Sequence, residues 1–224
     1  PNSCNLEYKW KASNGTMSPE SGFSNSKFKA PCETGLSSVV LDVQTKGETR
    51  ISKSIEIEVI GKEPHDISTD YEPSGFFDDI NSISMRRTEH QKKLCTEFIF
   101  RPTGRKGYGG VYWQTPANNW GAFKGKDLSG YEKVSFYVCS PDNATINFIA
   151  GGISDANLPN KDKFKRSTGF QKLSPNWEKL EIDLKGADLS SVIGGLAWTT
   201  NKQYNPSTIR FYIRDIIYER NPCK

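Results

Sequence analysis

The sequence predicts an all-β protein made of two β-sandwich domains. Short segments with alternating apolar and polar residues recur along the 224 residues, and turns rich in Gly, Pro, Asn, Asp and Ser separate them. This spacing is typical of sandwiches. No long stretch follows the period of an amphipathic helix. The polar, proline-containing segment 61–66 predicts a linker between a domain over residues 1–61 and a domain over residues 67–220.

The first domain contains three predicted strands, at 6–12, 38–45 and 53–60, where apolar and polar residues alternate. The strand with Tyr8 and Trp10, the Lys-Ala-Pro phrase at 29–31, Gly35 and the paired last strands resemble bacterial immunoglobulin-like or PKD-like modules. The resemblance implies a spacer domain that lacks its first strand and belongs to a longer parent protein. We expect Trp10 to lie in its core.

The second domain contains seven predicted strands separated by turn residues. They are expected at 93–100, 110–114, 133–139, 145–150, 178–183, 192–199 and 208–218.

Four phrases of the second domain resemble the jelly-roll carbohydrate-binding modules of secreted bacterial glycan-degrading proteins. They are Gly-Val-Tyr-Trp-Gln at 110–114 with Asn-Asn-Trp-Gly at 118–121, Asp-Leu-Ser-Gly-Tyr at 127–131 with Val-Ser-Phe-Tyr at 134–137, Trp-Glu-Lys-Leu-Glu-Ile-Asp-Leu at 177–184, and Phe-Tyr-Ile-Arg-Asp-Ile at 211–216. The resemblance implies an Ig-like β-sandwich followed by a jelly-roll β-sandwich. It also implies non-catalytic carbohydrate binding that targets a larger exported protein, at the cell surface or outside the cell, to a polysaccharide.

The segment 109–121 combines aromatic rings with short amides and has no charged side chain. Flat aromatic faces cover the apolar side of a sugar ring, and amides reach its hydroxyls as donors and acceptors. The alternative is a buried strand end followed by a turn that its own Asn side chains hold. Because side chains of a strand alternate between core and solvent, Tyr112 and Trp113 must point to opposite faces.

From these phrases we expect a binding site formed by Trp113, Gln114, Asn118, Trp120, Trp198, Asn201 and Lys202. For each of these side chains, the alternative interpretation is a structural role in the fold. The lack of charge in 109–121 favours a neutral polysaccharide. Basic clusters such as 161–166 are expected to be solvated loops, with a polyanion site as their alternative.

The jelly-roll resemblance also implies a structural calcium ion. The matching residues are Asp78 and Asp79, near the start of the domain, and Asp215 in the last predicted strand. Calcium binds carboxylate and carbonyl oxygens, and a buried carboxylate needs a cation or strong donors. The alternative for Asp215 is an ion pair with an Arg or Lys on the sheet surface.

Composition and motifs argue against several other classes. The 30 basic and 26 acidic residues are interspersed, which is too mild a balance for nucleic-acid binding. No apolar run approaches the roughly 20 residues of a membrane span. His65 lies in the linker and His90 in a charged loop, and no catalytic carboxylate or phosphate-binding phrase occurs, so we expect no enzyme. The remaining alternative is an adhesion or assembly module whose aromatic patch contacts a protein, because Tyr and Trp also anchor protein interfaces.

The five cysteines do not form a CxxC pair, and with two histidines they do not predict a zinc site. Cys4 and Cys32 lie in the same domain, where a disulfide joining its two ends fits an exported protein. Cys95 and Cys139 lie in predicted strands as small core residues.

Overall fold

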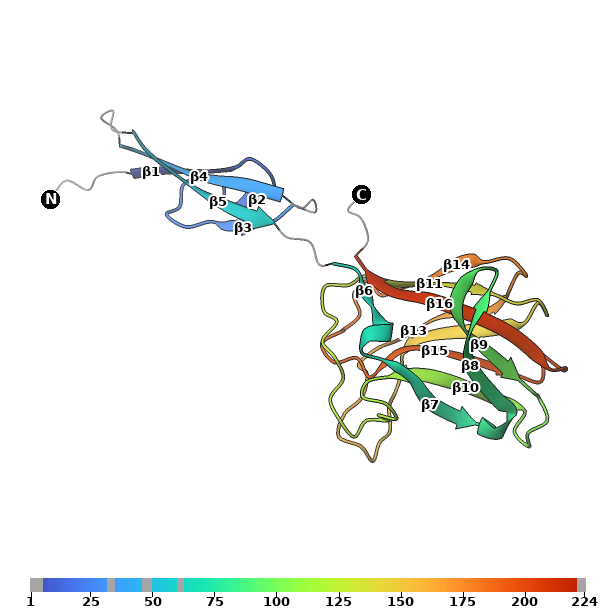
Figure 1. Cartoon of the computed structure of the whole chain (residues 1–224). Helices are drawn as coiled ribbons and strands as arrows, with labels where there is room; N and C mark the ends of the chain where they lie inside the picture. The colour runs from blue at the N-terminus through green and yellow to red at the C-terminus, as the bar shows by residue number, and fades with distance from the viewer. Residues whose placement is uncertain (1–5, 32–34, 46–49, 60–62, 221–224) are drawn as a thin grey trace. The chain divides into compact units, whose positions relative to one another are not determined.

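The computed structural model describes residues 6–31, 35–45, 50–59 and 63–220, and it confirms the all-β fold class. The described residues fall into two compact units, one within residues 1–61 and the other within 62–221 (Figure 1). Among the described residues, regular structure consists of strands and of two short 3₁₀ turns, η1 (Ile67–Thr69) and η2 (Ile80–Ser82). Within the described part of the chain, no helix is long and apolar enough to cross a membrane.

The first unit is built on a three-stranded antiparallel sheet. Its strand order is β1 (Leu6–Ala12), β4 (Gly35–Thr45) and β5 (Arg50–Val59), and β2 (Thr16–Ser18) pairs with β3 (Lys27–Lys29) in a separate hairpin. Met17 and Val39 are its buried apolar side chains among the described residues. Trp10 is half-buried, and its indole N–H donates to the carbonyl of Phe23 at 3.0 Å. Cys4 and Cys32 lie outside the described residues.

The second unit contains two facing antiparallel sheets. The five-stranded sheet has the order β13-β12-β15-β10-β7. Its strands are β7 (Glu72–Asp78), β10 (Tyr108–Gln114), β12 (Thr145–Gly151), β13 (Lys165–Lys172) and β15 (Gly194–Asn201).

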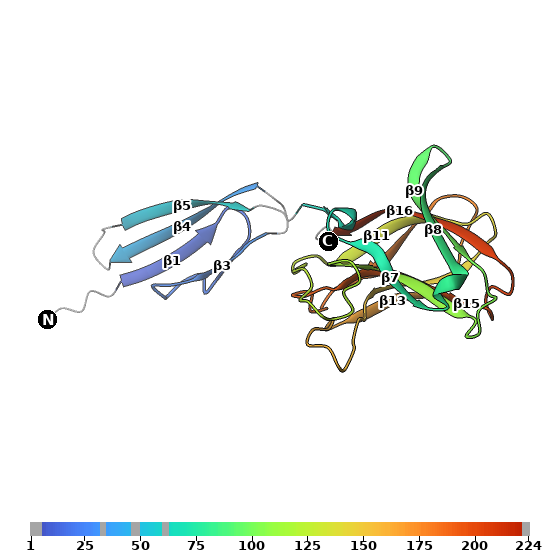
Figure 2. The same cartoon turned by 60° about the horizontal axis from the view of Figure 1, so that its bottom comes forward.

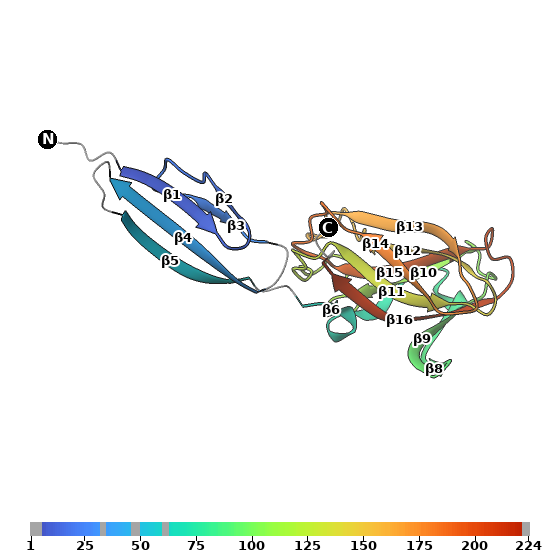
Figure 3. The same cartoon turned by 90° about the horizontal axis from the view of Figure 1, so that it is seen from above.

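The six-stranded sheet has the order β14-β11-β16-β9-β8, with the short strand β6 also paired to β16. Its strands are β6 (His65–Asp66), β8 (Ile83–His90), β9 (Lys93–Phe100), β11 (Lys133–Cys139), β14 (Glu178–Asp183) and β16 (Ile209–Glu219). Figures 2 and 3 both show the green hairpin of β8 and β9 projecting from the second unit.

Aromatic side chains fill the space between the two sheets. Phe98 of the six-stranded sheet contacts Trp113 and Trp198 of the five-stranded sheet edge-to-face, with ring centroids 5.5 and 5.2 Å apart. Phe211 of β16 packs on Trp198 and Phe98 as well. Such edge-to-face contacts stabilise beyond the burial of apolar area. They also fix which face of each sheet is the inner one.

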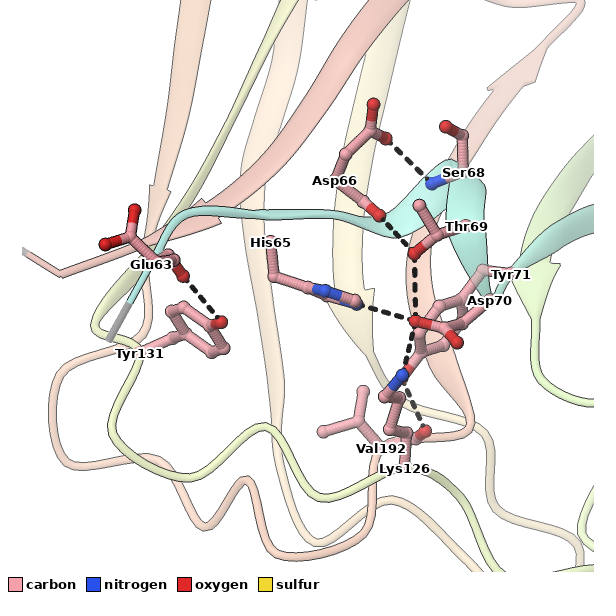
Figure 4. Close-up of polar contacts among 10 residues, drawn as sticks. All are labelled: Glu63, His65, Asp66, Ser68, Thr69, Asp70, Tyr71, Lys126, Tyr131 and Val192. Carbon is pink, nitrogen blue, oxygen red and sulfur yellow. Dashed lines mark hydrogen bonds and ion pairs between the residues drawn. The ribbon is translucent and has the colours of Figure 1, made fainter. Parts of the chain in front are cut away.

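Polar contacts tie the entry segment 63–71 to the loops of the second unit (Figure 4). Asp70 binds the Lys126 ammonium group and lies 3.0 Å from the His65 ring nitrogen. The hydrogen bond from Lys126 is the main cause that lowers the pKa of Asp70 below its usual value. The hydroxyl of Tyr131 donates to the carbonyl of Glu63 at 2.8 Å. The path of the chain from β6 into β7 is therefore set by side chains of distant loops.

Candidate functional site

The outward face of the five-stranded sheet carries an aromatic surface. Within β10, Val111 and Trp113 join the core between the sheets, so the alternation of the strand directs Tyr112 to the opposite face. There Tyr112 packs in a second apolar cluster whose buried members are Tyr112, Ile149, Ile153, Ile193 and Ala197. Phe77 and Trp120 are half-buried and pack against this cluster.

The aromatic rings of this face form a continuous series from β7 to the loop after β10. The rings of Tyr108 and Phe77 have centroids 5.8 Å apart, and those of Phe77 and Tyr112 are 5.6 Å apart. The ring of Trp120 meets Tyr112 edge-on at 5.9 Å. Three half-buried rings and one nearly buried ring therefore line one side of the sheet surface.

Asn119 shapes the loop that presents Trp120. Its buried amide group donates to the carbonyls of Thr115 and Phe123, at 2.8 and 2.9 Å. Its amide oxygen accepts from the backbone N–H groups of Gly121 and Phe123. Gly121 has a φ of 125°, and a Cβ there would come within 2.4 Å of the carbonyl of Asn160. Asn119 thus holds its own loop, as the structural alternative expected of these Asn residues, and it fixes the position of Trp120.

A groove of about 410 Å³ lies beside these rings and is lined by Tyr112, Trp120 and residues 152–156. A Cβ placed on Gly152 would lie 3.0 Å from Cγ of Lys165 and 3.4 Å from the Tyr112 hydroxyl. The lysine stem and the hydroxyl therefore flank the same point of the groove. Burial raises the pKa of Tyr112 to about 12, so its hydroxyl keeps its proton at neutral pH.

A buried carboxylate fastens the wall of the groove to the sheet. Asp162 accepts hydrogen bonds from the backbone N–H groups of Ile153, Ile193 and Gly194, at 2.9, 2.6 and 3.3 Å. Burial raises the pKa of Asp162 to about 6, although the three N–H donors oppose that shift. The charge state of this side chain is thus coupled to the position of Ile153, which lines the groove.

The structure separates the residues that the sequence grouped into one site. Trp113 and Trp198 are 4% and 0% exposed and lie in the core between the sheets, so neither indole can stack on a ligand at the surface. Gln114 is fully buried, and its amide atoms have no hydrogen-bond partner among the described residues. Trp120 is the expected residue that borders the groove.

The other three expected residues lie near the ends of the outward face. Asn118 is exposed, and its backbone N–H donates to the Ser74 hydroxyl. The amide oxygen of Asn201 accepts from the backbone N–H of Tyr204 at 3.0 Å and so holds the turn after β15. Lys202 is exposed at the same end, where its Cβ would contact a side chain placed on Gly107.

Sequence reasoning missed Phe77, Tyr108 and Lys165, and it preferred Trp113 to Tyr112. The alternation of β10 shows that Tyr112 and Trp113 diverge, but it does not say which of them faces the core. Phe77 belongs to a strand that was not expected. A glycine inside a strand, such as Gly110, signals a close approach without naming the partner. In the structure a Cβ at Gly110 would come 2.2 Å from the carbonyl of Trp198 and 2.3 Å from the ring of Phe77.

The three expected calcium ligands do not form one site. Asp78 pairs with the Lys106 ammonium group at 2.6 Å, and Asp79 accepts from the backbone N–H groups of Lys106 and Tyr108. Asp215 is paired with Arg214, its neighbour in β16 of the six-stranded sheet, which is the alternative expected for it. No group of three His, Cys, Asp or Glu side chains that could hold a metal ion occurs among the described residues. These carboxylates already have partners and do not fit a shared calcium ion.

Solved structures with a similar fold include several carbohydrate-binding modules. The family 11 module of the cellulosomal cellulase Lic26A-Cel5E of Clostridium thermocellum is 16% identical, with a TM-score of 0.46 over 73% of this chain and 89% of that chain. The family 11 module from Clostridium thermocellum in complex with a β-1,3-1,4-mixed-linked tetrasaccharide is also 16% identical, with a TM-score of 0.46 over 65% of this chain and 95% of that chain.

A family 30 carbohydrate-binding module is 12% identical, with a TM-score of 0.48 over 69% of this chain and 86% of that chain. Similarity at this level is a property of the fold and does not assign a ligand to this chain. No family model matches the chain, and no curated protein sequence matches it.

Proposed function

We propose that this chain is a non-catalytic carbohydrate-binding protein that holds a polysaccharide or oligosaccharide on the outward face of its five-stranded sheet. The observation that supports this function is the series of rings from Tyr108 to Trp120 beside a groove of about 410 Å³. An aromatic ring covers the apolar C–H side of a sugar and excludes water from it. A row of rings suits a chain of sugars better than a single one.

Polar groups with unused hydrogen-bonding capacity lie on the same face. The Oδ1 atom of Asn147 in β12 is buried and has no hydrogen-bond partner among the described residues. Asn147 pairs in register with Thr199 of β15, next to the position where Tyr112 pairs with Ala197. Sugar hydroxyls both donate and accept, so they suit the hydroxyl of Tyr112 at the groove, whereas the buried Oδ1 of Asn147 lies below the surface that a sugar contacts.

Binding of this kind is weak for a single module. A few stacking contacts and shallow hydrogen bonds correspond to dissociation constants between micromolar and millimolar. Attachment of several modules to one parent protein would recover strong binding through effective concentration. We therefore place the chain in a larger exported protein, with the first unit as a spacer and the second unit as the part that contacts the glycan.

Replacement of Trp120 by Ala tests the proposal directly. Trp120 is half-buried at the groove, so its removal should abolish pull-down by insoluble polysaccharides and binding on a glycan array. Trp177 is the matched control, because it is also a half-buried tryptophan but packs on Tyr212 of the other sheet. Trp177→Ala should keep binding. Near-ultraviolet circular dichroism must show that both variants remain folded.

Two results would contradict the proposal. One is unchanged glycan binding by folded Trp120→Ala. The other is equal loss of binding in both tryptophan variants, which would show that the outward face of the five-stranded sheet is not the specific binding surface.

A further inference from the structure

Most cations of the six-stranded sheet, apart from Arg87 and Lys93, form ion pairs with described residues, whereas the cations of the five-stranded sheet form none. On the six-stranded sheet, Arg86 and Arg210 contact Glu97, while Lys133 and Lys179 contact Glu181 and Glu219. On the five-stranded sheet, Lys165 and Lys172 of β13 form no ion pair with any described residue. The positive charge of β13 is therefore not neutralised within the described part of the protein.

The five-stranded sheet is also poor in carboxylates. Strands β10, β12, β13 and β15 contain no Asp or Glu. In β7 the acidic residues are Glu72 and Asp78 at its two ends, and Asp78 is already paired with Lys106. One carboxylate, Asp155, lines the groove, and the N–H groups of Asn157 that donate to its Oδ1 are uncharged.

Register places both lysines on the face that carries the aromatic rings. Lys165 pairs with Gly151, and Lys172 pairs with Thr145. Both partners lie an even number of residues from Asn147 and Ile149 in β12, which point away from the core, so they share that face. The stem of Lys165 lies beside the Tyr112 hydroxyl at the groove. Lys172 lies two residues beyond Phe170, whose exposed ring stacks on the exposed ring of Tyr204 at 4.1 Å.

The same combination of a ring and an unpaired ammonium group thus occurs twice on this face. Lys165 lies beside Tyr112, which lines the groove, and Lys172 lies two residues along β13 from Phe170, which stacks on Tyr204. The register partners of the two lysines, Gly151 and Thr145, are six residue steps apart along β12, so about 20 Å separates the lysines, which is longer than a single sugar. An acidic sugar offers a ring to the aromatic side chain and an anion to the lysine, and an anion bound by lysine makes a charge-assisted hydrogen bond.

We infer that the ligand of this face is an anionic polysaccharide, whose carboxylate or sulfate groups bind Lys165 and Lys172 while its rings stack on the neighbouring aromatic side chains. This inference rests on the proposed function and specifies its substrate class. It replaces the expectation of a neutral glycan, which came from the uncharged segment 109–121. That segment supplies rings to the face, whereas β13 supplies the charge.

The test compares polymers that share a backbone and differ in charge. Binding of the full chain is measured by affinity electrophoresis and calorimetry with polygalacturonate against its methyl ester, and with κ-carrageenan against desulfated κ-carrageenan. The first pair tests a carboxylate and the second pair tests a sulfate. We expect one charged polymer to bind at least tenfold more tightly than its neutral counterpart, and this preference to decrease as salt screens the charges.

Lys165→Gln and Lys172→Gln should each weaken binding of the charged polymer by about tenfold, the usual effect of losing one charge-assisted hydrogen bond. Arg166→Gln is the matched control, because Arg166 is exposed on the same strand but pairs with Ala150, whose side chain points into the core. It removes the same charge from the opposite face and should keep binding.

Three results would overturn the inference. If charged and neutral polymers bind equally and independently of salt, the protein binds carbohydrate but does not prefer an anionic ligand. Equal weakening by Arg166→Gln and Lys165→Gln would show that total charge matters and not this face. Failure of every polymer to bind would remove the proposed function and the inference together.

Discussion

At the scale of single residues, burial separates tryptophans that look alike in the sequence. Trp198 ends an apolar phrase and is followed by polar residues, yet it is fully enclosed between the sheets. Trp120 follows two asparagines in a loop and borders the groove. Alternation along a strand shows that neighbouring side chains point to opposite faces. Which face is the inner one is decided by contacts across the sandwich, such as those of Phe98 with Trp113 and Trp198. Such contacts between residues distant in the chain leave no local signal.

Trp198→Ala should destabilise the second unit strongly. It leaves a cavity among Phe98, Phe211 and Phe148, whose cost is about 3–5 kcal/mol for a buried aromatic side chain. Trp120→Ala should cost much less, because its ring is half-buried and lies outside this core. Urea unfolding of both variants measures the difference, and equal destabilisation would contradict the placement of Trp198.

Asp162 should make stability depend on pH in a direction opposite to that of most carboxylates. Its pKa is raised from 3.8 to about 6 in the folded protein, so the folded state binds the proton more tightly than the unfolded state does. The contribution of Asp162 to stability is therefore largest below pH 4 and decreases as pH rises to about 6. A shift of this size corresponds to a decrease on the order of 2–3 kcal/mol.

Comparison with Asp162→Asn isolates this effect, because the variant does not titrate at this position. Its lost hydrogen bonds give a pH-independent offset, whereas the difference in unfolding free energy between wild type and variant should change between pH 4 and pH 6. A constant difference over that range would show that Asp162 has an ordinary pKa.

At the scale of elements, the sequence predicts the inner strands of the two sheets of the second unit but only one of their four edge strands. The expected segments 93–100 and 133–139 coincide with the inner strands β9 and β11, and 178–183 coincides with the edge strand β14. Strands β7, β8 and β13 were not expected, and all three lie at the edge of a sheet. Edge strands bury few side chains, so selection does not require an alternating apolar pattern there. The aromatic face was incompletely predicted for the same reason, since Phe77 and Lys165 come from two of these strands.

Asn119 should be essential for the shape of the 115–123 loop. Asn119→Ala removes four hydrogen bonds at once, and the freed backbone groups around Gly121 and Phe123 are partly or fully buried. We expect a loss of about 1–3 kcal/mol and weaker glycan binding, because Trp120 is no longer held.

Hydrogen exchange gives the local readout for this prediction, since the amides of Gly121 and Phe123 should exchange faster in Asn119→Ala. Asn118→Gly is the control, because glycine accepts the φ of 57° at that position. Similar exchange rates in wild type and Asn119→Ala would mean that the loop is held by other contacts.

At the scale of the whole molecule, the two units of the chain differ in how many apolar side chains they bury. The second unit has an extensive core between its sheets, while the buried apolar side chains described in the first unit are Met17 and Val39. The sequence predicts this division from the polar segment 61–66, but it does not show how little the first unit buries. The strand β5 carries Ile51 and Ile55 with more than half of their surface exposed.

Calorimetry of the full chain should therefore show two thermal transitions. The first unit buries less apolar surface and should unfold at the lower temperature. Trp198→Ala should lower the midpoint of the upper transition and leave the lower one unchanged. A single transition that moves as a whole in this variant would show that the two units unfold cooperatively.

The burial of Trp113 and Trp198 also determines what fluorescence can report. Enclosed indoles emit at short wavelength and do not respond to a ligand outside the core, so these two residues give a constant background. Trp120 borders the groove, and a sugar that covers its ring would shift or quench its emission. Tryptophan emission of the unlabelled protein can thus follow a glycan titration, and the part of the signal that changes should disappear in Trp120→Phe.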